Sequence, residues 1–206
     1  MKINELLGIE YPIFQGGMAN IATGSFAAAV SNAGALGIIG AGGMNAETLR
    51  EEIRVCKELT EKPFGVNIML MNPEAEKMTK IVTDEQICVV TTGAGNPGKY
   101  VETWKKAGVK VFPVVSTVSL ARRLASLGVD GVIAEGCESG GHIGELTTMA
   151  LVPQVCDGVD VPVIAAGGIA GGRQMAAAFI LGASGVQIGT CLLASLECPI
   201  HQNYKE

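Results

Sequence analysis

One histidine and two carboxylates lie among glycines in residues 135–144, whose sequence is EGCESGGHIG. Imidazole titrates near neutral pH, so His142 could hold or transfer a proton, and the adjacent Gly140 and Gly141 would let a ligand approach closely. The preceding run, residues 131–134, has the β-branched character of a buried strand. His142 is therefore expected on a loop just beyond a strand, where parallel α/β folds place their chemistry. A histidine that is merely solvated on a loop is the alternative.

The sequence argues against a metal site and against a serine–histidine–acid triad. His201 is the only other histidine and lies in an irregular tail, so the chain has no recognisable spacing of metal ligands. No G-x-S-x-G pattern occurs, and a serine–histidine–acid triad would lack its nucleophile elbow. Glu135, at the end of the predicted strand, is expected to face either a ligand hydroxyl or a basic group in the same crevice.

Glycine-rich turns follow two apolar runs near the C-terminus. Gly167 and Gly168 follow the run that starts near residue 161, and Gly189 and Thr190 follow the next run. In a barrel these are the turns after the seventh and eighth strands, which commonly bind phosphate through backbone N–H groups. A tight turn with positive φ would explain any one of these glycines, but it explains less well why glycines follow both of these consecutive runs.

Small or polar residues also end the earlier runs. Gly16, Gly17 and Met18 follow the first run, and Asn67 belongs to the third. Such residues would suit a broad, flat, partly apolar ligand. Met18 could lie against an aromatic face of that ligand, although a methionine here more commonly fills the core. Asn67 would need a partner if buried, and its amide can serve a donor and an acceptor on a heterocycle.

The elements that must position these residues recur along the chain. Eight apolar, β-rich runs start 20 to 30 residues apart, the length that a strand, a helix and two loops require. They begin near Pro12, Leu36, Pro63, Val89, Val111, Gly131, Val161 and Val186. Helical patterns lie between them at residues 24–32, 45–60, 73–84, 99–107, 119–127, 147–156 and 173–181.

This alternation predicts an α/β fold, a (β/α)8 TIM barrel formed by a single domain over residues 1–206. A doubly wound sheet is the alternative, but it would more often have about five or six strands. Asn45 or Thr48 could cap the second helix. Glycines fall just past four predicted helices, where a left-handed residue is favoured. These are Gly34, Gly108, Gly128 and Gly182.

The barrel is expected to be C-terminally short. After the eighth run only residues 192–206 remain, which leaves little room for a last helix or a cap segment. Typical chains of this fold have ~250 residues. Either the sequence is a fragment, truncated at the C-terminus, or a partner or an extension provides the missing cover.

Composition limits the partners and the compartment. The chain is 48% hydrophobic with a net charge of −5, so it can bury a core but has no basic stripe for nucleic acid. The six cysteines lack C-x-x-C spacing and mostly lie in apolar runs, which favours buried free thiols in a reducing, cytoplasmic environment. They are Cys56, Cys88, Cys137, Cys156, Cys191 and Cys198. The N-terminus lacks the apolar region of a signal peptide.

One uncharged segment, residues 174–196, is long enough to be tested as a membrane span. Gly182, Gly185 and Gly189 divide it into a helix, a turn, a strand and a loop, which a single helix in lipid would not favour. We therefore expect no membrane segment.

Several motifs resemble one known family, the FMN-dependent barrel enzymes that comprise nitronate monooxygenases and FabK-type enoyl-[acyl-carrier-protein] reductases. Residues 11–18 (YPIFQGGM) resemble the opening of the family, and residues 30–40 (VSNAGALGIIG) resemble its next motif. Residues 140–149 (GGHIGELTTM) are similar to the reductase branch in particular. Residues 165–169 (AAGGI) and 185–190 (GVQIGT) match phosphate-binding motifs of the wider family. The resemblance covers essentially the whole chain.

The resemblance implies FMN as cofactor, with NADH or NADPH as co-substrate. The phosphate would lie on the turns after the last two strands, the ring near the first and third strands, and Glu135 toward the ribityl chain. The cofactor-binding residues implied are Gly16, Gly17, Met18, Asn67, Glu135, Gly140, Gly141, Gly167, Gly168, Gln187, Gly189 and Thr190. The implied reaction reduces a trans-2-enoyl thioester on acyl carrier protein or CoA, in fatty-acid biosynthesis. His142 would protonate the α-carbon or shape that site.

Two alternatives remain within this resemblance. The first is a nitronate monooxygenase, which would oxidise alkyl nitronates with O2, and the second is a truncated, catalytically silent flavin-binding protein. Family chains continue past this point with a cap segment and a final helix, and the full-length form is expected to be a homodimer. Ser139 stands where the family often has alanine, which is a mild departure.

Overall fold

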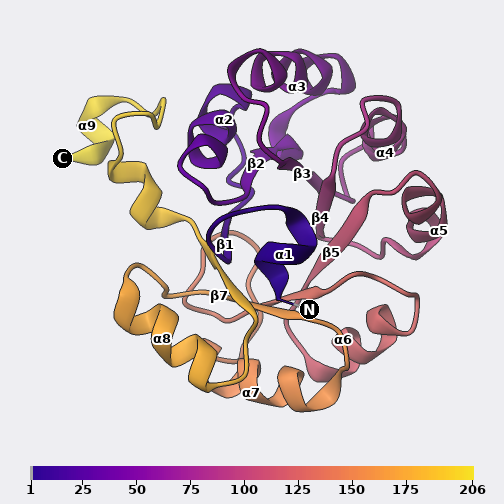
Figure 1. Cartoon of the computed structure of the whole chain (residues 1–206), viewed down its shortest axis with the longest axis vertical. Helices are drawn as coiled ribbons and strands as arrows, with labels where there is room; N and C mark the ends of the chain where they lie inside the picture. The colour runs from indigo at the N-terminus through magenta and orange to yellow at the C-terminus, as the bar shows by residue number, and fades with distance from the viewer. Residues whose placement is uncertain (1) are drawn as a thin grey trace.

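Eight parallel strands form a ring, with helices on the outside (Figure 1). The computed structural model describes residues 2–206. Neighbouring strands pair in the order β1-β8-β7-β6-β5-β4-β3-β2, and a bridge between Phe14 and Leu36 closes the ring. The strands are β1 (Ile13–Gln15), β2 (Gly37–Gly40), β3 (Phe64–Met69), β4 (Val89–Gly93), β5 (Lys110–Val115), β6 (Val132–Glu135), β7 (Val163–Ala166) and β8 (Gly185–Ile188). The predicted (β/α)8 TIM barrel is confirmed.

Seven helices lie between successive strands, where the sequence predicts them. They are α2 (Gly24–Asn32), α3 (Ala46–Leu59), α4 (Ala75–Asp84), α5 (Gly98–Lys106), α6 (Val118–Ala125), α7 (Thr148–Gly158) and α8 (Gly172–Ile180). Of the two candidate caps of α3, Asn45 is the one used, because its side chain accepts a hydrogen bond from Thr48 N–H. The four glycines predicted to end helices have φ between 81° and 100°, so these left-handed turns are confirmed.

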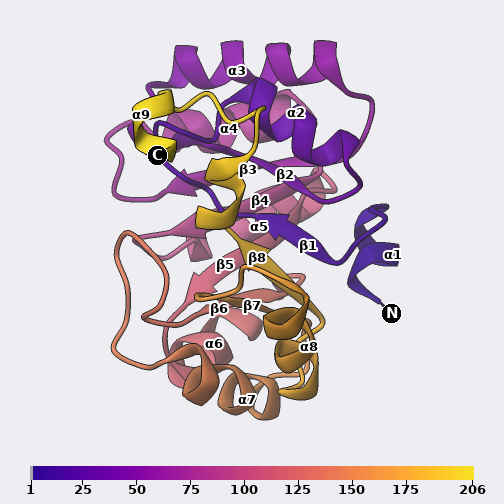
Figure 2. The same cartoon turned by 90° about the vertical axis from the view of Figure 1, so that its left-hand side faces the viewer.

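Side chains on the strands alternate between two apolar layers. The inner layer fills the barrel and includes Phe14 and Phe112, whose rings meet edge to face with centroids 5.4 Å apart. The outer layer lies between strands and helices. The sequence pattern does not predict the short helix α1 (Ile3–Leu7), which places Ile3 and Leu7 in the inner layer and covers one end of the barrel (Figure 2).

The pairing of β1 with β2 combines backbone hydrogen bonds with one from a side chain. The backbone provides two hydrogen bonds, from Gln15 N–H to Leu36 O (2.9 Å) and from Leu36 N–H to Ile13 O (2.8 Å). The fully buried side chain of Gln15 then accepts a third, from Ile38 N–H to Oε1 at 3.1 Å. A side-chain amide thus takes the place of a backbone acceptor at this seam. Gln15 Nε2 has no partner within residues 2–206.

The segment after β8 runs toward α2 (Figure 1). Its elements are the 3₁₀ helix η2 (Thr190–Ala194) and the short helix α9 (Gln202–Lys205); a further 3₁₀ helix, η1 (Ala41–Gly43), follows β2. Cys198 of this segment is buried against Phe26 of α2. Ile180 of α8 and Leu196 stay 86% and 96% exposed, so the segment covers α2 and leaves the end of α8 open. The prediction of a C-terminally short barrel is confirmed.

All six cysteines are free thiols, but fewer are buried than the sequence predicts. Cys56 and Cys198 are buried, whereas Cys88 is exposed and the others are half-buried. The prediction fails because Cys88, Cys137 and Cys191 lie next to strand ends, where the chain leaves the core.

Residues 174–196 fold as most of α8, then β8 and η2, as their glycines predict. Within residues 2–206 the structure contains no helix long and apolar enough to cross a membrane.

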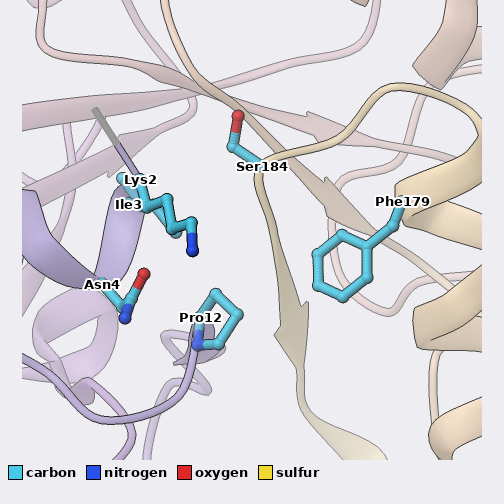
Figure 3. A pocket seen from close by; sticks show the side chains of 6 residues that line it. All are labelled: Lys2, Ile3, Asn4, Pro12, Phe179 and Ser184. Atoms are coloured by element: carbon cyan, nitrogen blue, oxygen red, sulfur yellow. The ribbon is translucent and has the colours of Figure 1, made fainter.

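A surface cavity of about 410 Å³ opens at the end of the barrel that α1 covers (Figure 3). Lys2, Ile3 and Asn4 line one side, and Phe179 of α8 faces them from the other (Figure 3). None of the residues that the sequence assigns to a site lines this cavity, because those residues follow the strands at the opposite end.

We expect Gln15→Met to lower the free energy of unfolding by about 1–3 kcal/mol, because it leaves the buried Ile38 N–H without an acceptor at similar side-chain volume. Chemical denaturation followed by circular dichroism measures this. Gln154→Met, at an exposed position of α7, is the matched control and should change the value by less than about 0.5 kcal/mol. Equal losses in the two variants would contradict the role of Gln15.

Candidate active site

The residues singled out from the sequence meet at the C-terminal ends of the strands. Side chains alternate along a strand, so a residue two positions after an inner-layer residue points to the same side. Near the C-terminal ends of the strands, such residues face the mouth of the barrel. On β3, β4, β6 and β8 these are Asn67, Thr91, Glu135 and Gln187, which follow Gly65, Val89, Ile133 and Gly185. The barrel therefore has a polar mouth above an apolar interior.

Asn67 has the partner that its position requires. Its Nδ2 donates to the hydroxyl of the buried Thr91 at 2.9 Å. Asn67 Oδ1 accepts no hydrogen bond from the described part of the chain, so it remains free for a ligand. Gly17 lies directly against this side chain, because a Cβ atom there would overlap Asn67 Cβ. Only glycine lets the loop after β1 approach β3 so closely.

Glu135 and Gln187 lie on the two strands that flank β7. Glu135 Oε2 and Gln187 Nε2 are 3.5 Å apart, at the limit of a hydrogen bond. Burial raises the pKa of the Glu135 carboxyl, and the nearby side chain of Ser139 opposes the shift. No lysine or arginine among residues 2–206 pairs with Glu135, so the basic partner considered from the sequence is wrong. A ligand hydroxyl remains as the expected partner.

His142 lies on the loop between β6 and α7, as expected, and is exposed. Within residues 2–206 it makes no hydrogen bond or ion pair. A Cβ atom on Gly140 or Gly141 would meet nothing within 4 Å, although Gly141 has φ +85°. Gly144 packs closely against Ser116, so the far side of the loop is anchored while the imidazole is open to a ligand. The catalytic role of His142 stays a prediction.

The turn after β7 presents unpaired backbone donors. Gly167 and Gly168 have φ of +104° and +68°, which other residues rarely adopt. The N–H groups of Gly168, Ile169 and Ala170 donate to no acceptor within the described residues. α8 begins just afterwards at Gly172, and no side chain caps its first turn. Several N–H groups at a helix start suit an anionic group, so this turn fits the phosphate of the expected cofactor.

The turn after β8 lies beside the loop after β1. Gly16 N–H donates to Ile188 O at 2.7 Å, and a Cβ atom on Gly189 would lie 3.6 Å from Met18 Sδ. Thr190 begins η2, whose first N–H groups have no intrahelical partner. Met18 also packs into the apolar cluster between α2 and the C-terminal segment, so it partly fills the core. The structure thus brings together the two groups of residues assigned to the ring and to the phosphate.

Glu138 and Thr148 form contacts that sequence reasoning missed. Glu138 Oε2 accepts hydrogen bonds from Thr148 N–H at 2.8 Å and from Thr148 Oγ1 at 2.9 Å. A carboxylate and a threonine close to a helix start are a signal for capping. The two residues are ten positions apart, however, so nothing in the sequence pairs them.

The fold and the site together define the class of this chain: it is a (β/α)8-barrel protein with a polar mouth, and the turn after β7 presents N–H groups that have no acceptor among residues 2–206. The family model described as "Nitronate monooxygenase" matches residues 1–86 and 74–206. The chain therefore belongs to the nitronate monooxygenase family.

Individual relatives are similar over nearly the whole chain. FabK from Thermotoga maritima is 55% identical with a TM-score of 0.97, over 98% of this chain and 65% of that one. The (3aS,4S,5R,7aS)-5-hydroxy-7a-methyl-1-oxo-octahydro-1H-indene-4-carboxyl-CoA dehydrogenase of Rhodococcus jostii is 38% identical, over 98% of this chain and 58% of the relative. A probable nitronate monooxygenase of Staphylococcus aureus is 34% identical, over 94% and 68%. The chain thus spans only 58% to 68% of the length of these relatives.

We expect Glu135→Gln to stabilise the chain at neutral pH and to have its smallest effect near pH 4. Below the unfolded pKa of about 4.3 the carboxyl is protonated in both states, so its burial costs little. As pH rises through the raised folded pKa, the original chain loses stability that glutamine retains. Thermal unfolding of both proteins across this range measures the difference, with Glu145→Gln on the following loop as control. A difference that does not grow with pH would contradict the burial effect.

Proposed function

We propose that this chain is the FMN-binding barrel of an enoyl thioester reductase, which uses NADH or NADPH to reduce trans-2-enoyl groups on acyl carrier protein or CoA. The similarity to FabK carries the proposal, because identity is 55% there and 34% to 38% for the other two relatives. The name of the Rhodococcus jostii relative includes a carboxyl-CoA, which supports a thioester substrate.

The mouth of the barrel supports FMN as the cofactor. The unpaired N–H groups from Gly168 onward would bind its phosphate, together with the turn at Gly189. Asn67, held by Thr91, would present its free Oδ1 to the edge of the ring. Glu135 would accept a hydrogen bond from a ribityl hydroxyl. Its carboxyl is buried, which raises its pKa, and no cationic side chain within the described residues pairs with it.

The reaction divides between the cofactor and the chain. Delivery of a hydride to the β-carbon of the enoyl group is the chemistry that FMN, reduced by NAD(P)H, would supply when bound. His142 would donate a proton to the α-carbon, so the double bond would gain one hydride and one proton and become a single bond. The exposed side chains of Ile143, Leu146 and Met149 provide an apolar surface near His142 for the acyl chain.

A second candidate follows from the family match itself. A nitronate monooxygenase would bind FMN with the same residues, but it would consume O2 with alkyl nitronates and would need no NAD(P)H. The two candidates therefore differ in the electron donor and in the oxidant.

An absorbance spectrum of the purified chain, followed by anaerobic addition of NADH and then NADPH, tests the proposal. We expect bound FMN that NAD(P)H reduces, and FMN-dependent oxidation of NAD(P)H by crotonyl thioester. Oxygen uptake with alkyl nitronates and no NAD(P)H would favour the second candidate. Bound FMN with neither activity would indicate a catalytically silent flavin-binding protein, and no binding of FMN would contradict both candidates.

We expect His142→Ala to keep FMN and to lower kcat by about 10²-fold, because it removes the proton donor and leaves the phosphate-binding turn intact. Flavin titration and steady-state kinetics measure the two effects. His201→Ala, in the C-terminal segment, is the control. Loss of FMN from His142→Ala would show that His142 is mainly structural.

A further inference from the structure

The hydroxyl of Thr148 lies where three parts of the candidate site meet. Thr148 begins α7, and its Oγ1 is 2.9 Å from Glu138 Oε2, 3.0 Å from Gly167 O and 3.1 Å from Ala166 O. Two glycines leave room for it, because a Cβ atom on Gly167 would lie 2.6 Å from Oγ1 and one on Gly136 would overlap Thr148. The side chain therefore fits a slot between the backbones that follow β6 and β7.

Glu138 closes the base of the His142 loop. The loop leaves β6 at Gly136 and enters α7 at Thr148, where Glu138 Oε2 accepts a hydrogen bond from Thr148 N–H at 2.8 Å and lies 2.9 Å from Thr148 Oγ1. Desolvation acts to raise the pKa of Glu138, but hydrogen bonds from Thr148 and from nearby groups outweigh it and lower the pKa. The carboxylate is thus ionised at neutral pH, and bonds to it are roughly twice as strong as neutral ones.

Thr148 also constrains the peptide between Gly167 and Gly168. Ala166 O already accepts a hydrogen bond from Gly136 N–H at 3.0 Å. Gly167 O has only the Thr148 hydroxyl within reach as a donor among residues 2–206, and this hydroxyl shares its single proton among Gly167 O, Ala166 O and Glu138 Oε2. In a trans peptide the carbonyl and the following N–H point in opposite directions. Holding Gly167 O against Thr148 therefore turns the N–H of Gly168 away from α7 and leaves it for a ligand.

We propose that Glu138 and Thr148 are positioning residues that hold the His142 loop and the Gly167–Gly168 turn in one fixed arrangement. Neither residue is assigned a contact with cofactor or substrate; Glu138 acts through the loop, and Thr148 acts through the peptide of the turn. The proton donor and the phosphate-binding turn then move as one unit. The roles of the His142 loop in proton donation and of the Gly167–Gly168 turn in phosphate binding rest on the proposed function, but the contact between the loop and the turn does not.

Amide hydrogen exchange in the ligand-free chain tests the contact independently of function. In Glu138→Ala, amides of residues 137–147 are expected to exchange about tenfold faster, because charge-assisted bonds at the base of the loop are lost. Glu145→Ala removes a carboxylate of the same loop that has no hydrogen-bond partner within the described residues, so it should leave the exchange unchanged. Equal exchange rates in the two variants would overturn the proposal.

Two substitutions of Thr148 separate its hydroxyl from its packing. Thr148→Val keeps the shape and loses the hydroxyl, so it should weaken FMN binding and lower kcat by about tenfold each. Thr148→Ser keeps the hydroxyl and should stay within about twofold of the original chain in both. Equal losses with valine and serine would show that Thr148 only fills space, which overturns the proposal. If the original chain binds no FMN, the proposed function fails, and the exchange experiment still decides the contact.

Discussion

Closure of the barrel between β1 and β2 is the contact on which the site depends. β1 has three residues and pairs fully with β8, so its link to β2 consists of two backbone bonds at Leu36 and the buried amide of Gln15. This link sets the direction in which the chain continues into the following loop. The loop in turn places Gly17 against Asn67 and Met18 beside Gly189. A tilt of β1 would move Gly17 away from Asn67 and Met18 away from Gly189.

The repeat of strands and helices could be predicted because it is a local property of the sequence. α2 begins and ends at the predicted residues, Gly24 and Asn32, and every strand starts within two residues of its expected position. α1 escaped prediction because five residues are too few for a helical period, and it is held by contacts of Ile3 inside the barrel. The role of Gln15 could not be seen either, since it depends on how closely β2 approaches a residue 23 positions away.

The site was predictable in outline for a related reason: parallel strands bring their C-terminal ends to one edge, so residues after each strand had to meet. The partners within the mouth were not predictable. Asn67 and Thr91 are 24 positions apart, and nothing local pairs them. The environment of Glu135 could not be predicted either, because the absence of a cation beside a buried carboxyl is seen only when all its neighbours in space are known. Tertiary contacts, unlike strand ends, leave no periodic trace in a sequence.

The two sides of the mouth differ in how much change they can accept. Where Gly17 meets Asn67, even a methyl group would displace the loop, so that side has one possible shape. On the other side, Ile143, Leu146 and Met149 are exposed, and the space around Gly140 is empty. Their size and polarity can vary without disturbing a strand. Residues 143–149 can therefore change without altering the contacts between Gly17 and Asn67 on the other side of the mouth, which makes this loop the natural region for redesigning what the mouth can bind.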